Sequence, residues 1–434
     1  MSSVYRYRIF CETEQSMIYI WDTTAPIVCP NNNTHIINTT SIVIVDEVNT
    51  TQTEITNLNS DNTQTLQTVS KNVIINLPPF YGISPFRNNV NTTGSGYASN
   101  SPLTESEIKL NCSGANDSVI LRSIERGFYV SGLTCEAGIA IRIPSNNVTG
   151  NQVLKWGYFS NQNGFYYKLT STDFQVCILN NSIETCISRN NFNGDKVDGN
   201  GKSGSLLDFS KGNIFTILFS WYGFGLVSFY VSGASKNTNQ SPIVLHEYQT
   251  VGRTSTRIPN LPIQVILNNN GTVANTNIFI AGRQFSILGN HTPSKRVTSL
   301  YKYLFSMSHE IFLPIFSIKR KIEFTGCSIK LYNIKIKSSV DCEVRILTNT
   351  TLISSSWGSN SQTSESACDV DLSSTSSSDG ITLYSIICFA GEINEHVLNS
   401  DFELNELLPI TVICKSLTGV NGNITCNLYW NEYW

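Results

Sequence analysis

The chain has 434 residues, a formal net charge of −3 and only 14% charged residues. This length allows two or three domains with sizeable cores, and the weak net charge gives no electrostatic reason to expect nucleic acid or a membrane surface as partner. Good helix formers are scarce beside the many Asn, Ser, Thr, Ile, Tyr and Phe residues, so the composition predicts an all-β protein.

The first predicted unit is a small N-terminal β module over residues 1–47. Its segments YRYRIF, MIYIW and SIVIV are rich in β-branched and aromatic residues and are typical of strands.

Residues 48–104 are polar, contain Gly and Pro, and show little periodicity. That composition predicts a linker or an extended arm that lies along a partner.

The rest of the chain predicts tandem β-sandwich or jelly-roll domains, because many short strand-like segments alternate with turns such as NQNG and NNNG. The first domain covers residues 105–307 and the second covers residues 308–434, with a serine-rich loop over 354–379.

The uncharged stretch 214–231 has the length of a membrane span. Its central YGFG divides it into two runs of strand length, so two buried strands around a turn are predicted instead.

The stretch DGNGKSGSLLDFSKGN, residues 198–213, contains the Gly-Lys-Ser order of a phosphate-binding loop. The position that should hold the first glycine of that motif is Lys196, and too few residues follow for a helix. We therefore interpret the stretch as a turn between strands. Asp198 begins this loop, and Gly199, Gly201 and Gly204 allow it positive φ angles.

The 12 cysteines include no CxxC pair and the five histidines are scattered, so no spacing indicates a zinc site and no metal or cofactor is expected. In CILNNSIETC, a two-residue turn places Cys177 opposite Cys186 on adjacent antiparallel strands. This register predicts a disulfide, with buried free thiols as the alternative. The further candidate pairs are Cys11–Cys29 and Cys112–Cys135.

Two segments in the middle of the chain carry a resemblance to a known module. WGYFSNQNGFYYKL is similar to a "GYF…NGFYF" strand pair, and residues 195–231 are similar to a "DKxDGxGxSGxxLD" loop followed by "IFxxxFxWxGxGxVxF". The module occurs in structural proteins of large eukaryotic DNA viruses and tailed phages, whose members often have proline where Lys202 stands. The matching positions are Asp195, Lys196, Asp198, Gly199, Gly201, Ser203, Gly204, Leu207, Asp208, Trp221, Gly223, Gly225 and Val227.

The likeness covers most of the chain, with residues 48–104 the exception. It implies a virion structural protein on the particle surface, either a minor capsid protein or a fibre-like or spike-like projection. Other capsid proteins and further copies of the chain would then be its partners. The resemblance supplies no catalytic residues.

The alternative is a carbohydrate-binding host-attachment protein whose exposed aromatic rings stack on host surface glycans. Core packing is the competing interpretation for every such ring. The candidate contact residues are Trp156, Tyr429, Trp430, Tyr433 and Trp434.

A glycosidase is the third hypothesis, with Asp195, Asp198 and Asp208 as candidate carboxylates. No spacing marks any two of them as acid and nucleophile, and Asp is common in turns because its side chain bonds the local backbone. A calcium ion held by Asp195 and Asp198 is a further alternative. We expect no enzymatic activity.

Overall fold

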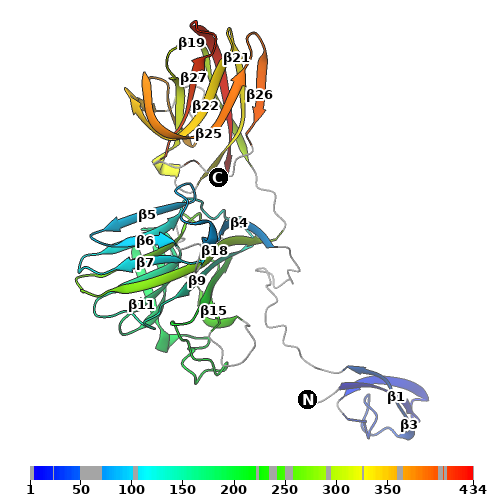
Figure 1. Cartoon of the computed structure of the whole chain (residues 1–434). Coiled ribbons are helices and arrows are strands. Elements are labelled where there is room, and N and C mark those ends of the chain that lie inside the picture. The colour runs from blue at the N-terminus through cyan, green and yellow to red at the C-terminus, as the bar shows by residue number, and fades with distance from the viewer. Residues whose placement is uncertain are drawn as a thin grey trace. The chain divides into compact units, whose positions relative to one another are not determined.

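The computed structural model shows an all-β chain, as the composition predicts (Figure 1). The only helical elements among the described residues are three single 3-10 turns. None of the helices found there has the length and apolarity needed to cross a membrane. The described residues are 4–22, 24–48, 71–100, 106–220, 224–233, 242–249, 258–289, 295–324, 327–358, 365–398, 404 and 408–433.

The N-terminal module is a three-stranded antiparallel sheet with the order β2-β1-β3. Its strands are β1 (Val4–Cys11), β2 (Ser16–Asp22) and β3 (Ile37–Val48). The module forms a unit separate from the rest of the chain. Its buried cluster is small: Tyr7, Ile9, Cys11, Cys29 and Ile37.

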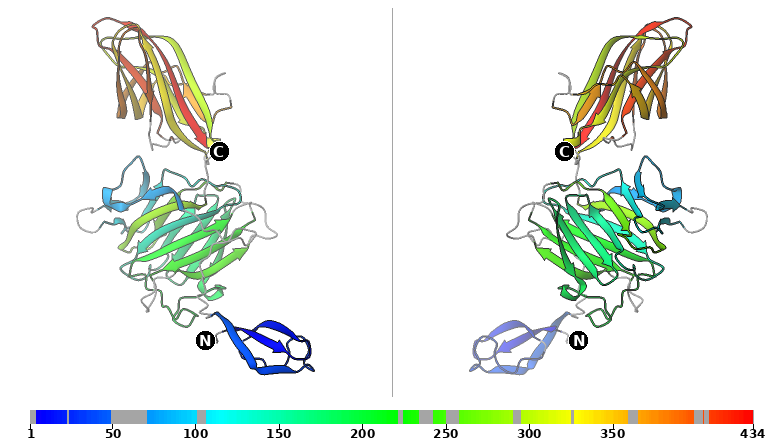
Figure 2. Two further views of the ribbon diagram at one scale, coloured as in Figure 1. Left: turned by 90° about the vertical axis from the view of Figure 1, so that its right-hand side faces the viewer. Right: turned by 90° about the vertical axis from the view of Figure 1, so that its left-hand side faces the viewer.

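The middle domain is a sandwich of two antiparallel sheets that share one core (Figures 1 and 2). One sheet has the order β13 (Ile183–Ser188), β12 (Phe174–Asn180), β11 (Gly164–Thr170), β10 (Val153–Phe159), β17 (Ile263–Asn268), β8 (Ser118–Ser123) and β5 (Asn88–Thr93). The other has the order β16 (Ile243–Gln249), β15 (Leu226–Ser232), β14 (Asn213–Ser220), β9 (Thr134–Arg142), β18 (Thr276–Leu288), β7 (Ile108–Cys112) and β6 (Tyr97–Asn100), and β4 (Lys71–Leu77) also pairs with β18.

Strands β14 and β15 pair as antiparallel neighbours, from Ile214 opposite Ser232 to Phe219 opposite Val227. The uncharged stretch is therefore a strand pair, as its YGFG interruption predicts. Residues 221–223 of that turn lie outside the described residues.

The prediction of an arm over residues 48–104 is wrong for residues 71–100. Strands β4, β5 and β6 lie there, and they extend both sheets of the middle sandwich. Strand β5 has the sequence NNVNTT, and half of its residues are exposed. An edge strand with this exposure lacks the apolar alternation by which a strand is recognised in a sequence.

The C-terminal domain is a second sandwich, made of a four-stranded and a six-stranded sheet around its own core. The smaller sheet has the order β19 (Arg296–Met307), β28 (Gly422–Tyr433), β21 (Ser328–Ser338) and β26 (Ile393–Val397). The larger has the order β23 (Trp357–Gly358), β24 (Cys368–Asp371), β20 (Leu313–Arg320), β27 (Ile410–Ser416), β22 (Cys342–Ile353) and β25 (Ser376–Cys388).

Two predicted boundaries in this part of the chain are wrong. The domain starts before residue 308, because β19 pairs with β28 from Arg296 opposite Glu432 to Met307 opposite Gly422. The serine-rich stretch 354–379 is also not one loop, since β23, β24 and the start of β25 lie within it. Apolar alternation shows that a strand forms but does not identify the partner with which it pairs.

Trp156 lies at the centre of the middle core, with none of its surface exposed. Its ring stacks on Tyr167 and Phe174, with centroids 5.7 and 6.0 Å away. We expect Trp156→Ala to lower the free energy of unfolding of this domain by about 3–5 kcal/mol, the usual cost of removing a buried aromatic ring. Calorimetry on the full chain measures the change.

The matched control is Tyr81→Ala, because Tyr81 is 84% exposed. This change should stay within about 0.5 kcal/mol, as surface substitutions do. Equal effects of the two substitutions would contradict the packing described for Trp156.

Candidate functional site

The glycine loop is built around the carboxylate of Asp195. Its Oδ1 accepts a hydrogen bond from the Val197 N–H at 2.7 Å, and its Oδ2 accepts one from the Ser203 N–H, also at 2.7 Å. Burial raises the pKa of Asp195, but these hydrogen bonds outweigh that effect and hold the pKa below its ordinary value. Strand β14 follows the loop, where a phosphate-binding loop requires a helix.

The three glycines of this loop meet two different requirements. Gly199 and Gly204 have positive φ angles of 90° and 61°, as expected. Position 201 needs glycine because the Asp195 side chain packs directly against its backbone. A Cβ there would lie 2.1 Å from Asp195 Oδ1. The expectation of a positive φ at Gly201 has no support in the structure.

The other loop carboxylates also bond the local backbone. Asp198 Oδ1 accepts a hydrogen bond from the Asn200 N–H at 2.9 Å, and Asp208 Oδ1 accepts one from the Ser210 N–H at 2.9 Å. This is the behaviour of turn-forming aspartates.

A disulfide joins Cys177 and Cys186, which face each other across β12 and β13 as the register count predicts. Asn181 and Ser182 form the turn with φ angles of 49° and 67°, which suit a two-residue hairpin.

The other two candidate pairs are not disulfides, because all four of their cysteines are free. Cys112 and Cys135 lie on β7 and β9, and β18 separates these strands. Cys112 lies opposite Thr276 of β18 and Cys135 lies opposite Ile287, at positions far apart along that strand.

The predicted aromatic contact residues differ in how deeply they are buried. Trp156 and Trp430 are fully buried, so the prediction that they contact glycans is wrong. Trp430 belongs to the C-terminal core, and its Nε1 donates a hydrogen bond to Glu432 Oε1 at 2.8 Å. Tyr429 and Tyr433 are half-buried, and Trp434 lies outside the described residues.

Tyr429 lies on the outer face of the four-stranded sheet in the C-terminal domain. Side chains alternate across a strand, and Leu300 of β19 and Leu428 of β28 point into the core, so their neighbours point outward. We call this outer surface the tyrosine–amide face. It is made of Tyr301, Tyr303, Asn333, Lys335, Glu395, Asn427 and Tyr429.

The strand register sets the arrangement of this face. Tyr301 lies opposite Asn427, Asn427 opposite Lys335, and Lys335 opposite Glu395, so these four residues form one row across four strands. Asn333 lies opposite Tyr429 in the next row. In these two rows, the rings of Tyr301 and Tyr429 thus border a stripe of amide and charged groups.

The rings of Tyr301 and Tyr303 are exposed by 42% and 65%. They stack on each other with centroids 6.3 Å apart and planes tilted by 26°. Lys335 Nζ lies 5.9 Å from the centroid of the Tyr429 ring. The three tyrosines therefore provide ring surface on two adjacent strands.

Hydrogen bonds hold the polar side chains of this face in place. Asn427 Nδ2 donates to Tyr429 Oη at 2.7 Å, and Asn333 Nδ2 donates to Glu395 Oε1 at 2.6 Å. The Lys335 ammonium lies 3.2 Å from the other carboxylate oxygen of Glu395. The hydrogen bond from Asn333 and the nearby Lys335 hold the pKa of Glu395 below its ordinary value, so its carboxylate is charged at neutral pH.

Two acceptors on this face have no hydrogen-bond partner. They are the Oδ1 atoms of Asn333 and Asn427, and both atoms are buried. An unpaired buried acceptor carries a desolvation cost that a ligand hydroxyl would remove.

No protein-family model and no curated protein sequence matches the chain. Several solved structures align with about half of it. The binding domain of botulinum neurotoxin DC in complex with rat synaptotagmin II is 15% identical, with a TM-score of 0.29 over 48% of this chain and 45% of that chain. The alignment therefore spans under half of the neurotoxin chain.

Two further solved structures are carbohydrate-recognition or lectin-like domains. The Emp47p carbohydrate recognition domain is 14% identical, with a TM-score of 0.32 over 51% of this chain and 97% of that chain. A legume lectin-like domain from Entamoeba histolytica is 10% identical, with a TM-score of 0.30 over 45% of this chain and 89% of that chain. Likeness this low assigns no function to the chain.

The Asp195 turn gives a stability prediction. Gly201→Ala should lower the free energy of unfolding by about 1–3 kcal/mol. The new Cβ would push away the Asp195 carboxylate and break its hydrogen bonds from the Val197 and Ser203 N–H groups. Lys202→Ala, next to it and exposed, should change stability by less than about 0.5 kcal/mol. Denaturant titration of both variants tests this, and loss of nucleotide binding in Lys202→Ala would contradict a purely structural loop.

Proposed function

We propose that this chain is a carbohydrate-binding attachment protein and that the tyrosine–amide face is its glycan site. The observation that carries the proposal is the position of Tyr301, Tyr303 and Tyr429 on one sheet surface beside amide and charged groups. A sugar ring has an apolar face of C–H groups and a rim of hydroxyls. It therefore needs both an aromatic surface and directed hydrogen bonds.

Each part of the face has a role in this proposal. Tyr301 and Tyr303 offer ring surface for stacking. The Glu395 carboxylate and the Lys335 ammonium offer an acceptor and donors for hydroxyls. Hydroxyls could also pair with the Oδ1 atoms of Asn333 and Asn427 once small side-chain movements uncover them.

The dimensions of the face favour a short oligosaccharide. Neighbouring strands lie about 4.8 Å apart, so the row from Tyr301 to Glu395 spans about 14 Å. That length suits two or three linked sugar rings lying across the strands. A shallow site of this kind binds weakly alone, and a homo-oligomer would raise the avidity by presenting several copies.

We further propose that the protein is displayed on the surface of a virus particle, as a minor capsid or fibre-like component. The support is the resemblance of residues 156–169 and 195–231 to the viral and phage module. Glycan binding and particle display are compatible, since an attachment protein must reach the host surface from the particle.

Glycan binding is tested with an array followed by calorimetric titration of the best ligand. The full chain should bind saturably, and Tyr301→Ala and Tyr429→Ala should each weaken binding about two- to tenfold, because a lost stacking contact costs about 0.5–1.5 kcal/mol. Tyr81→Ala, which removes an exposed ring on the other sandwich, should leave affinity unchanged. Equal affinity in all variants would show that the glycan binds elsewhere on the protein. No binding to any glycan on the array would contradict the carbohydrate hypothesis.

Particle display is tested by peptide mass spectrometry on gradient-purified virus, before and after brief surface proteolysis. Peptides from residues 105–434 should be present on intact particles and lost after proteolysis. Protected peptides would indicate an internal position, and absence from particles would contradict the virion proposal.

A further inference from the structure

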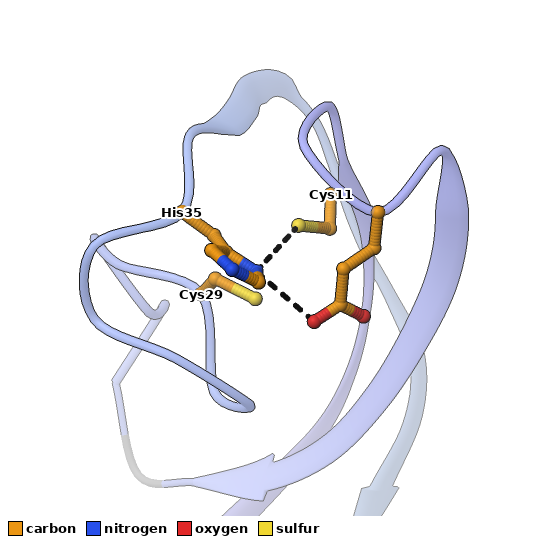
Figure 3. A group of neighbouring side chains, drawn as sticks. Cys11, Cys29 and His35 are labelled. Carbon is orange, nitrogen blue, oxygen red and sulfur yellow. Dashed lines mark hydrogen bonds and ion pairs between the residues drawn. The ribbon is translucent and has the colours of Figure 1, made fainter.

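Four side chains with metal-binding atoms meet at one end of the N-terminal module (Figure 3). Cys11 ends β1, Glu14 lies in the turn between β1 and β2, and Cys29 and His35 come from the segment that leads into β3. One ligand atom from each lies within 4.8 Å of all the others. Cys11 and Cys29 are buried, and His35 is half-buried.

The separations are close to those of a tetrahedral zinc site. Zn–S and Zn–N bonds of about 2.3 and 2.0 Å place neighbouring ligand atoms about 3.3–3.8 Å apart. Cys11 Sγ lies 3.9 Å from His35 Nδ1, and His35 Nδ1 lies 3.0 Å from Glu14 Oε1. Small side-chain movements would therefore bring these atoms into coordination.

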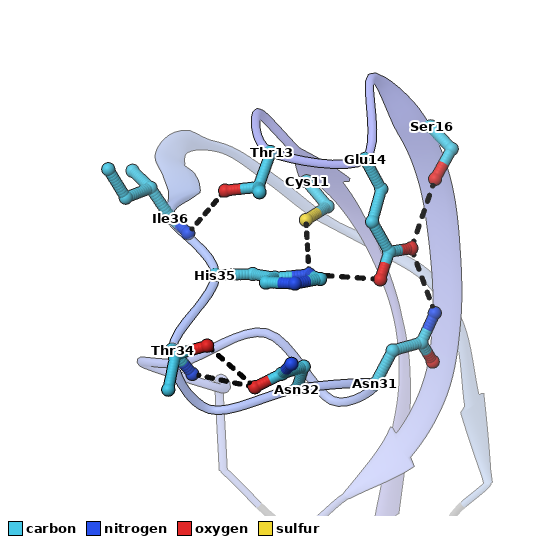
Figure 4. A network of polar contacts seen from close by, with 9 residues as sticks. All are labelled: Cys11, Thr13, Glu14, Ser16, Asn31, Asn32, Thr34, His35 and Ile36. Carbon is cyan, nitrogen blue, oxygen red and sulfur yellow. Dashed lines mark hydrogen bonds and ion pairs between the residues drawn. The ribbon is translucent and has the colours of Figure 1, made fainter.

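Hydrogen bonds join the two segments that carry the ligands (Figure 4). The Ile36 N–H donates to Thr13 Oγ1 at 3.0 Å, and the Glu12 N–H donates to the Ile36 carbonyl at 2.9 Å. The His35 N–H closes a turn onto the Asn32 carbonyl at 3.0 Å. The histidine is thus held next to the turn that contains Glu14.

Asn31 orients the carboxylate. Its Nδ2 donates to Glu14 Oε2 at 3.0 Å, and Oε1 faces the histidine (Figure 4). A hydrogen bond of this kind to a ligand fixes its orientation and is typical of metal sites.

The module also needs stabilisation beyond its apolar core. Five buried residues on a three-stranded sheet are few for a separate folding unit, and domains this small usually rely on disulfides or a metal ion. The cluster's two cysteines are both free. The other Cys/Glu group among the described residues has its two sulfurs in the Cys177–Cys186 disulfide and has no thiolate to offer.

We propose that the N-terminal module binds one zinc ion through Cys11 Sγ, Cys29 Sγ, His35 Nδ1 and the Glu14 carboxylate, and that this ion stabilises the module. Two thiolates and an imidazole select a borderline-soft metal, whereas calcium and magnesium take oxygen ligands only. Four protein ligands close the coordination sphere, which is the mark of a structural site.

Metal content of the full chain is the first test. Protein purified under reducing conditions, loaded with zinc and dialysed should retain one equivalent, and Cys29→Ser and His35→Ala should lose it. Cys112→Ser and His309→Ala are matched controls outside the cluster and should retain it. Equal zinc in Cys29→Ser and the unchanged chain, or a Cys11–Cys29 disulfide in place of bound zinc, would overturn the proposal.

Cobalt substitution tests the ligands without relying on variants that lose their fold. Co²⁺ in the full chain should give thiolate charge-transfer bands and intense tetrahedral d–d bands. Glu14→Gln should keep the charge-transfer bands and weaken metal affinity at least about tenfold. Weak octahedral bands with no thiolate transitions would contradict coordination by Cys11 and Cys29.

The stabilising role has its own readout. Removing zinc from the full chain with a chelator should speed proteolytic cleavage within residues 4–48, and adding zinc back should reverse this. Unchanged cleavage after complete zinc removal would contradict the stabilising role of the ion.

Discussion

The alternation of side chains across paired strands is the constraint on which this structure depends. In a two-layer sandwich, every strand directs one set of side chains into the core and the other set outward. On β19 and β28 this rule buries Leu300 and Leu428 and leaves Tyr301 and Tyr429 on the outer surface. The proposed glycan face is therefore a consequence of the same pattern that forms the C-terminal core.

In the N-terminal module, this alternation of side chains buries only a small apolar core. The described residues of this module form one small sheet with no second sheet packed on it, and the buried cluster is correspondingly small. The polar cluster of Cys11, Glu14, Cys29 and His35 lies at the end of this sheet. A metal ion there would supply the stability that apolar packing supplies in the sandwiches.

The sequence predicted those features that depend on neighbouring residues. The all-β class and the Cys177–Cys186 pairing follow from local patterns and from a two-residue turn. Features that depend on distant pairing were missed or were left between two interpretations. The partner of β19, the place of β5 at a sheet edge and the burial of Trp156 each depend on segments far away in the chain. The meeting of Cys11, Glu14, Cys29 and His35 was missed for the same reason, because these residues follow no standard spacing and come together only after the turn and the loop have folded.

The most direct measurement of the central claim is hydroxyl-radical footprinting of the full chain with and without a glycan that it binds. The account predicts protection of Tyr301, Tyr303 and Tyr429 in the complex, with Tyr81 oxidised equally in both states. Unchanged oxidation of the three tyrosines, or protection confined to the middle sandwich, would contradict the assignment of the glycan site to the outer face of the C-terminal sheet.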